Sequence, residues 1–221
     1  MAQAILIIGD SGQGKSTSLR NLNPKETYIF NVNNKPLPFK NGRTDYSLAN
    51  KNIHHTDNVL EIINIIKVIK EKRTDIKNIV IDDMNYLMQN EFIRRSKEKG
   101  YEKFTEIGTN FANLIHELRL LPEHIFPICI MHPEVNTDTF GNKTYKAKTV
   151  GKLVDQYLNI EGMFSIVLYC KASKDENQKL QYNFITQSDG TTSAKSPMGM
   201  LNETEPNDME IIINKIKEYY K

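Results

Sequence analysis

The residues with the clearest chemical capacity form one short segment near the N-terminus, which fills the pattern G-x-x-x-x-G-K-[ST]. Backbone N–H groups of such a segment surround phosphate oxygens, its lysine contacts the β- and γ-phosphates, and its hydroxyl binds Mg²⁺. Its glycines let the backbone adopt positive φ and approach an anion closely. The segment predicts a phosphate-binding loop, with Lys15 as a catalytic cation and Ser16 as a metal ligand. The predicted nucleotide-binding residues are Gly9, Asp10, Ser11, Gly12, Gln13, Gly14, Lys15, Ser16 and Thr17.

Three further polar residues follow apolar segments and could complete this site. Asp82 follows the segment 76–81 and is predicted to hold Mg²⁺, through water, as an acidic residue at a strand end does in P-loop proteins. Its neighbour Asp83 has two open interpretations: a general base that polarises the attacking water, or a cap for the helix that follows. His132 follows the segment 125–131. We interpret it as a sensor of the γ-phosphate, with an ordinary structural histidine as the alternative.

A basic segment, residues 136–150, is a second candidate for binding. A Gly-Asn pair at 141–142 predicts a hairpin turn. Over residues 136–152, lysines at 143, 146, 148 and 152 stand against one aspartate at 138, which gives a local charge of +3. Aromatic residues at 140 and 145 lie among these lysines, and charge combined with stacking rings is the chemistry of single-strand binding. The alternative is a solvated hairpin without a ligand. The predicted DNA-binding residues are Lys143, Tyr145, Lys146 and Lys148.

Helices and strands must position these groups. Apolar segments of strand length are expected at 4–8, 27–32, 76–83, 125–131, 163–169 and 180–186. Helical periodicity is expected from 16, at 57–72 with Asp57 as its cap, at 85–99, at 103–121 and in a C-terminal helix at 206–221. Residues 33–56 show no period and predict a long exposed loop. This alternation predicts an α/β fold: a mostly parallel central sheet with helices on both faces and antiparallel strands added near the C-terminus.

Length and composition limit the remaining possibilities. A chain of 221 residues fits one domain, so we expect residues 1–221 to fold as a single unit. The formal net charge of +2 imposes no global field that would require nucleic acid or a membrane. The absence of a leader and of a long apolar stretch predicts a cytoplasmic protein without a membrane partner. Cys129 and Cys170 lie in apolar segments and are expected to be buried free thiols.

The order of these features resembles the RecA-like P-loop ATPases encoded by phages, a group that includes proteins described as single-strand annealing proteins. The resemblance depends on Gly9–Ser16, Ile79–Asp83, the strand that ends at His132, and Thr191–Ser196. It implies ATP and Mg²⁺ as cofactors, self-association into a ring or filament, and the host cytoplasm as location. Such ATPases usually place a carboxylate after the second strand, whereas residues 30–34 contain no acid. This departure either moves the base role to Asp83 or implies slow hydrolysis.

The same resemblance implies cations supplied by a neighbouring subunit, for which Lys146, Lys148 and Lys195 are candidates. The expected function is a Mg²⁺-dependent ATPase that binds single-stranded DNA in phage recombination or replication. One alternative is a small-molecule or nucleotide kinase with acceptor and lid segments at 33–56 and 136–150, although no arginine follows Arg119. Another is an assembly ATPase that does not act on nucleic acid. No guanine-reading Asn-Lys-x-Asp motif is present, so we expect ATP rather than GTP.

Overall fold

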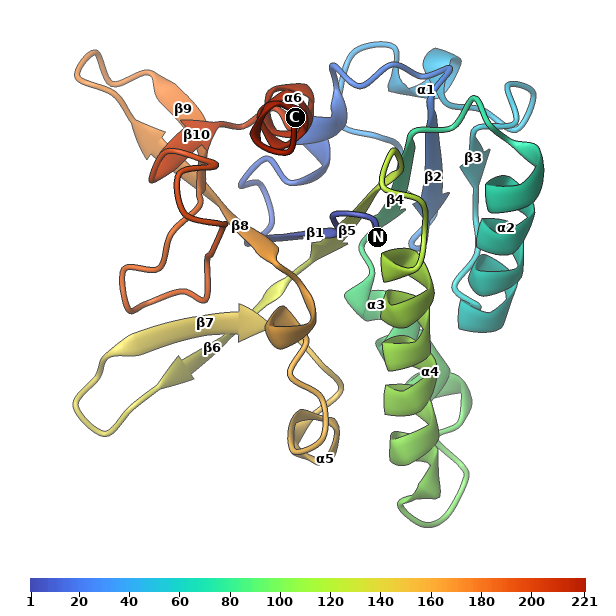
Figure 1. The fold of residues 1–221 in the computed structure, drawn as a ribbon. Coiled ribbons are helices and arrows are strands. Elements are labelled where there is room, and N and C mark those ends of the chain that lie inside the picture. The colour runs from blue at the N-terminus through green and yellow to red at the C-terminus, as the bar shows by residue number, and fades with distance from the viewer.

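A central eight-stranded sheet organises the computed structural model, which describes residues 1–221 (Figure 1). Its strands are β1 (Ile5–Ile8), β2 (Thr27–Asn31), β3 (Ile53–His54), β4 (Asn78–Asp82), β5 (Phe126–Met131), β8 (Ile166–Lys174), β9 (Leu180–Ile185) and β10 (Thr204–Pro206). Their order across the sheet is β10-β9-β8-β1-β5-β4-β2-β3. Strands β8 to β3 in this order pair in parallel, and β9 and β10 add antiparallel pairs at one edge. The predicted fold class is confirmed.

Two apolar cores lie on opposite faces of the sheet. One face packs against α2 (Val59–Lys72), α3 (Asn85–Arg94) and α4 (Glu102–Arg119), and the other packs against α6 (Met209–Tyr219) and the 3₁₀ turn η1 (Ser16–Leu19). Side chains of β1 alternate between these cores. Because both faces are covered, β1, β4 and β5 are buried at every position, as continuous apolar strands of a parallel sheet should be. Cys129 and Cys170 are buried and free, as predicted.

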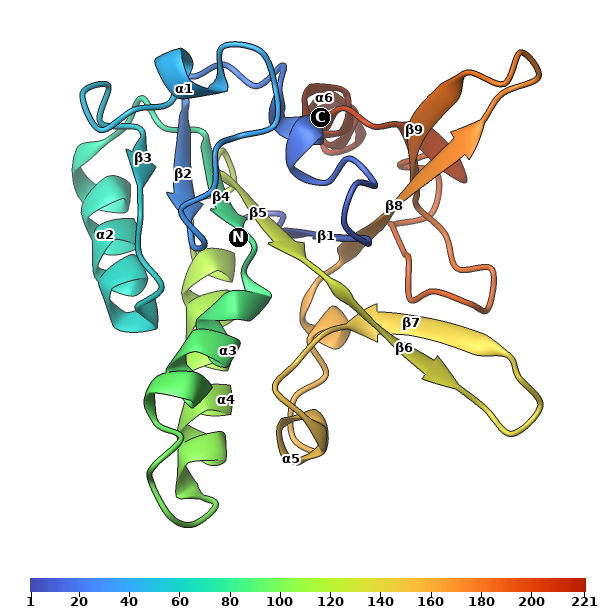
Figure 2. The same ribbon diagram turned by 180° about the vertical axis from the view of Figure 1, so that it is seen from behind.

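A hairpin leaves the sheet directly after β5. It consists of β6 (Pro133–Thr137) and β7 (Lys143–Ala147), which form a separate two-stranded sheet with Pro133 opposite Ala147. Tyr145 of β7 also forms a single bridge to Thr192. Figures 1 and 2 show it extending away from the body of the molecule beside β8. Two short elements follow it, α5 (Lys152–Asp155), which packs near α4, and the 3₁₀ turn η2 (Glu161–Met163). The predicted hairpin at 136–150 thus begins three residues earlier, at Pro133.

The structure corrects several predicted elements. The helix expected from Ser16 is a single 3₁₀ turn, in which the Ser18 hydroxyl donates to the carbonyl of Lys15. Residues 33–56 are not one loop, since they contain α1 (Gly42–Asp45) and β3. Strand β3 has only two residues, and its position depends on its pairing with β2. The local sequence does not indicate this pairing.

Two helix starts also differ from prediction. The side chain of Asn58, not that of Asp57, caps α2 by accepting from the N–H groups of Leu60 and Glu61. Asp57 instead accepts from Asn90 and Arg94 of α3. The C-terminal helix begins at Met209, after a cap by Asp208, because Pro206 belongs to β10. Proline at an edge strand has no ladder hydrogen bond to lose.

Candidate nucleotide-binding site

The residues with chemical capacity meet at the carboxyl edge of the parallel strands. The phosphate-binding loop follows β1, Asp82 ends β4, His132 follows β5, and β5 lies between β1 and β4. Ligands bind at this edge in open α/β sheets. A cavity of about 340 Å³ opens there. It is lined by Ser11, Gly12, Gly14, Lys15, Ser16, Thr17, Lys35, Pro36, Pro38, Asp82, Asp83, His132 and Tyr182.

Close packing fixes the loop around its glycines. Gly14 has φ of +89°, and a Cβ atom there would lie 3.0 Å from the ring of Tyr182 and 3.1 Å from Asn207 Oδ1. A Cβ atom at Gly9 would lie 2.9 Å from the Cβ of Cys170. Gln13 accepts from the backbone N–H of Ala172 in β8, which ties the loop to the neighbouring strand. Three predicted nucleotide-binding residues, Gly9, Asp10 and Gln13, line an adjacent cavity on this strand's side rather than the first one.

Lys15 is buried at the base of the loop, with 7% of its surface exposed. Its ammonium donates to the carbonyls of Gly9 at 2.7 Å and Asp10 at 2.9 Å. Burial lowers its pKa, while Cys170 and the nearby carboxylates, Asp83 first among them, oppose that shift. An ammonium has three N–H donors, so one remains for a phosphate oxygen. The position fits the predicted role.

Ser16 and Asp82 form the pair expected of a magnesium site. The Ser16 hydroxyl donates to Asp82 Oδ1 at 2.7 Å, and burial, followed by the charge of Asp83, raises the pKa of Asp82 to about 6. A bound cation would offset the cost of this buried carboxylate. No group of three or more His, Cys, Asp or Glu side chains could hold an ion alone. Mg²⁺ commonly combines one or two protein oxygens with phosphates and water, and this pair supplies such oxygens.

Asp83 is held by three donors from two segments. Its carboxylate accepts from Asn33 Nδ2 at 2.9 Å and Lys35 Nζ at 2.9 Å, and lies 3.3 Å from His132 Nε2. Burial alone would raise the pKa of Asp83, but the hydrogen bonds from His132, Lys35 and Asn33 together hold it well below its usual range. The backbone of Asp83 is left-handed, with φ of +61°. Its side chain does not cap α3, so the capping interpretation is wrong.

His132 lies between the two halves of this site. Its ring is near Asp83 and stacks edge-on against Tyr86, with ring centroids 5.9 Å apart. Its backbone N–H donates to Asn85 Oδ1 at 3.1 Å. The side chain is 19% exposed and borders the cavity, so it can contact both Asp83 and a ligand.

Sequence reasoning missed Asn33, Lys35 and Tyr182. The first two directly follow β2, whose carboxyl end lies at the same sheet edge, and this position was an available signal. Tyr182 comes from β9, which is distant in sequence, and only the antiparallel pairing of β9 with β8 brings it to the loop. No local pattern marks it.

The predicted DNA-binding residues do not share one environment. Lys143 and Lys148 are exposed, whereas Lys146 forms an ion pair with Asp155 at 3.0 Å. Tyr145 is partly buried against the larger core, and its carbonyl accepts from the Tyr169 hydroxyl. At the hairpin tip, Phe140 is 88% exposed and was not among the predicted contacts.

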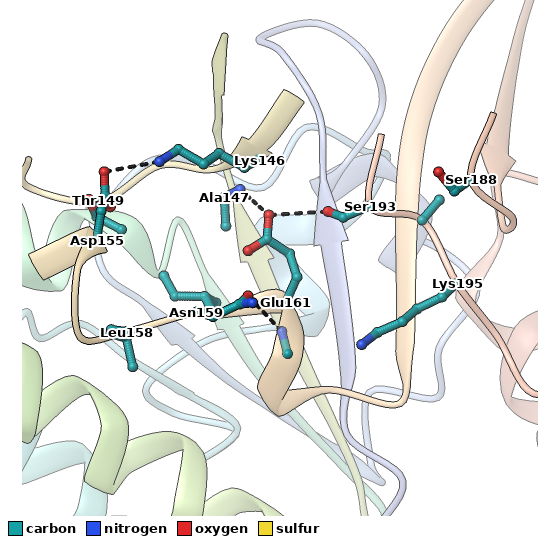
Figure 3. A pocket seen from close by; sticks show the side chains of 13 residues that line it. Lys146, Ala147, Thr149, Asp155, Leu158, Asn159, Glu161, Ser188, Ser193 and Lys195 are labelled. Carbon is teal, nitrogen blue, oxygen red and sulfur yellow. Dashed lines mark hydrogen bonds and ion pairs between the residues drawn. The ribbon is translucent and has the colours of Figure 1, made fainter. Parts of the chain in front are cut away.

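Lys146 and Lys195 border a second cavity of about 630 Å³, away from the phosphate-binding loop (Figure 3). They approach it from different segments, and Glu161 lies between them, where it accepts from Ala147 N and Ser193 Oγ. None of the proposed trans cations Lys146, Lys148 and Lys195 lines the nucleotide cavity of its own chain. Any action of theirs on a nucleotide would therefore require another copy.

The fold and this site define a P-loop NTPase. Residues 1–198 match the family described as AAA domain, and the chain belongs to that family. Nucleotide binding follows from this membership. No curated protein matches the sequence. No helix combines the length and apolar character needed to cross a membrane.

Proposed function

We propose that the protein is a Mg²⁺-dependent ATPase whose hydrolysis is coupled to single-stranded DNA. The observation that carries the enzymatic part is the convergence of Lys15, the Ser16–Asp82 pair, Asp83 and His132 on one cavity. A binding protein without turnover would need the loop but would have no use for a second, ionised carboxylate beside it. The site supplies both.

In the proposed reaction, a water oxygen attacks the γ-phosphorus. A new P–O bond forms, the bond to the β–γ bridging oxygen breaks, and its electron pair leaves with ADP. Asp83 accepts a hydrogen bond from the water and polarises it; because its donors hold the pKa of Asp83 well below its usual range, the water proton passes to a phosphate oxygen. Lys15 stabilises charge on the β- and γ-oxygens. Ser16 and Asp82 would hold Mg²⁺, which would neutralise phosphate charge when bound. His132 reports the γ-phosphate through its contact with Asp83.

The DNA part is supported by the hairpin. It projects from the sheet and carries an exposed aromatic ring, Phe140, and exposed lysines at 143 and 148. Such rings stack on bases of any sequence, and the lysines attract the backbone. The resemblance to phage-encoded RecA-like ATPases favours a role in phage recombination or replication, performed by a ring or filament of several copies in the host cytoplasm.

The test is phosphate release from ATP measured with and without single-stranded DNA, at low salt and with Mg²⁺ present or chelated. We expect Mg²⁺-dependent turnover that DNA stimulates, and none in Lys15→Ala, which lacks the charge at the phosphates. Lys25→Ala, on the exposed turn before β2, is the matched control. Unchanged turnover in Lys15→Ala would refute the site. A turnover rate that does not change when DNA is added would favour an assembly ATPase. Phosphate transfer to an acceptor would favour a kinase.

A further inference from the structure

The nucleotide cavity contains a second cation from its own chain. Lys15 and Lys35 are the only lysine or arginine residues among those that line it, and Lys35 reaches it from the segment after β2. Lys15 is committed to the loop carbonyls, whereas the side chain of Lys35 is 60% exposed. No arginine borders the cavity.

The backbone of Lys35 is fixed by hydrogen bonds although the residue is exposed. Asn31, which is only 3% exposed, donates from Nδ2 to the Lys35 carbonyl at 2.6 Å and accepts from the Lys35 N–H at 3.2 Å. Both backbone polar groups of Lys35 are thus bonded to one buried side chain. Asn34 before it adopts φ of +51°, and Pro36 after it restricts the chain further. The segment therefore holds the Lys35 backbone in place at the border of the cavity.

The contacts of the Lys35 ammonium leave it able to take another ligand. It lies 2.9 Å from Asp83 Oδ2 and 5.3 Å from the centre of the Tyr86 ring. The same Oδ2 atom also accepts from Asn33 Nδ2, and Oδ1 faces His132. Without Lys35, Oδ2 therefore keeps the hydrogen bond from Asn33, and Oδ1 keeps His132 Nε2 at 3.3 Å. An ammonium with three donors uses one here, so two remain for other oxygens.

We propose that Lys35 binds the γ-phosphate of the nucleotide in the same chain and is the cation that stabilises charge as the phosphoryl group transfers. This inference rests on the proposed function. When the bond to the bridging oxygen breaks, negative charge is shared between that oxygen and the γ-oxygens, and a preorganised cation lowers the barrier. Lys35 performs the task usually given to a cation from a neighbouring subunit. Each copy then contains a complete phosphate site.

The first test compares Lys35→Ala with Lys40→Ala, an exposed lysine of the same segment that does not line the cavity. Calorimetry measures binding of ADP and of the non-hydrolysable triphosphate AMP-PNP. A γ-phosphate contact predicts that Lys35→Ala weakens AMP-PNP binding by about tenfold or more and leaves ADP binding within about twofold. Turnover should fall by about 10²–10³-fold. Equal effects on ADP and AMP-PNP, or none on either, would refute the contact and leave Lys35 as a partner of Asp83 alone.

The second test separates a cation in the same chain from one supplied by another copy. Lys35→Ala and Lys15→Ala proteins are mixed in equal amounts and turnover is measured. If Lys35 acts within its chain, each copy lacks one essential cation and mixing restores nothing. Recovery on mixing would overturn the proposal, because the Lys15→Ala copy would have donated its Lys35. The binding measurements with ADP and AMP-PNP also separate failure of this inference from failure of the proposed function. They can show that Lys35→Ala loses its preference for AMP-PNP even if the wild-type protein does not hydrolyse ATP.

Discussion

Neutralising the two exposed lysines of the hairpin should change how DNA binding depends on salt. Each phosphate contact on a single strand contributes about 0.7 to the slope of log K against log salt. Lys143 and Lys148 are exposed, so the double change to alanine should reduce the slope by about 1.4. Between about 50 and about 200 mM salt, the wild-type protein should then lose about sevenfold more affinity than the variant. Fluorescence anisotropy of a labelled oligonucleotide over a salt series measures this.

The ion pair of Lys146 provides the matched control. Because Asp155 lies 3.0 Å from its ammonium, Lys146→Ala removes a cation that is already paired and should leave the slope nearly unchanged. Phe140→Ala should weaken binding by about 1–3 kcal/mol through lost stacking, again with little change in slope, because a ring releases no counterion. A slope that falls as much for Lys146→Ala as for either exposed lysine would refute this assignment. Absence of single-strand binding in the wild type would refute the DNA proposal.

Two further predictions concern the site. Asp83→Asn should keep nucleotide binding but lose at least about a hundredfold in turnover, because a neutral amide cannot polarise the attacking water as a carboxylate does; a loss of only a few-fold in a steady-state phosphate assay would contradict this role. Gly14→Ala should lower the free energy of unfolding more than Gly12→Ala, since both residues have positive φ but only Gly14 has atoms within 4 Å of the added Cβ. The Gly12 change should cost about 1 kcal/mol of backbone strain, and equal urea midpoints for the two variants would show that the Tyr182 and Asn207 contacts are not restrictive.

The elements that could be predicted from sequence are those whose signal is local. Buried parallel strands are continuous apolar runs, so β1, β4 and β5 were recognisable, and so were the polar residues at their ends. Parallel strands all end at one edge of the sheet. The sequence therefore predicts that the loop, Asp82 and His132 lie close together at that edge. The general outline of the site can therefore be predicted from the sequence alone.

The features that could not be predicted depend on contacts between distant segments. The two-residue strand β3 exists because Ile53 pairs beside Ile29, and Tyr182 reaches the loop only through the register of β9 with β8. The left-handed backbone of Asp83 has no marker in sequence, because aspartate tolerates that conformation without requiring it. No sequence pattern distinguishes Lys146 from the neighbouring lysines, because its ion pair with Asp155 depends on how the chain folds.

The direct succession of β5, His132 and β6 has a mechanical consequence. The residue that borders the nucleotide cavity is followed immediately by the first residue of the hairpin, and the carbonyl of His132 accepts from Lys148 N on the returning chain at 2.9 Å. Both ends of the hairpin are thus joined at His132, and β7 is also held at Tyr145, whose N–H donates to the carbonyl of Thr191 at 2.8 Å. A five-residue strand is about 16 Å long, so a rotation of about 10° at His132 would displace the hairpin tip by about 3 Å. Such a rotation would have to break the hydrogen bonds that Tyr145 makes with Thr191 and Tyr169, so these two bonds decide whether a change in the cavity moves Phe140 by most of the spacing between stacked bases.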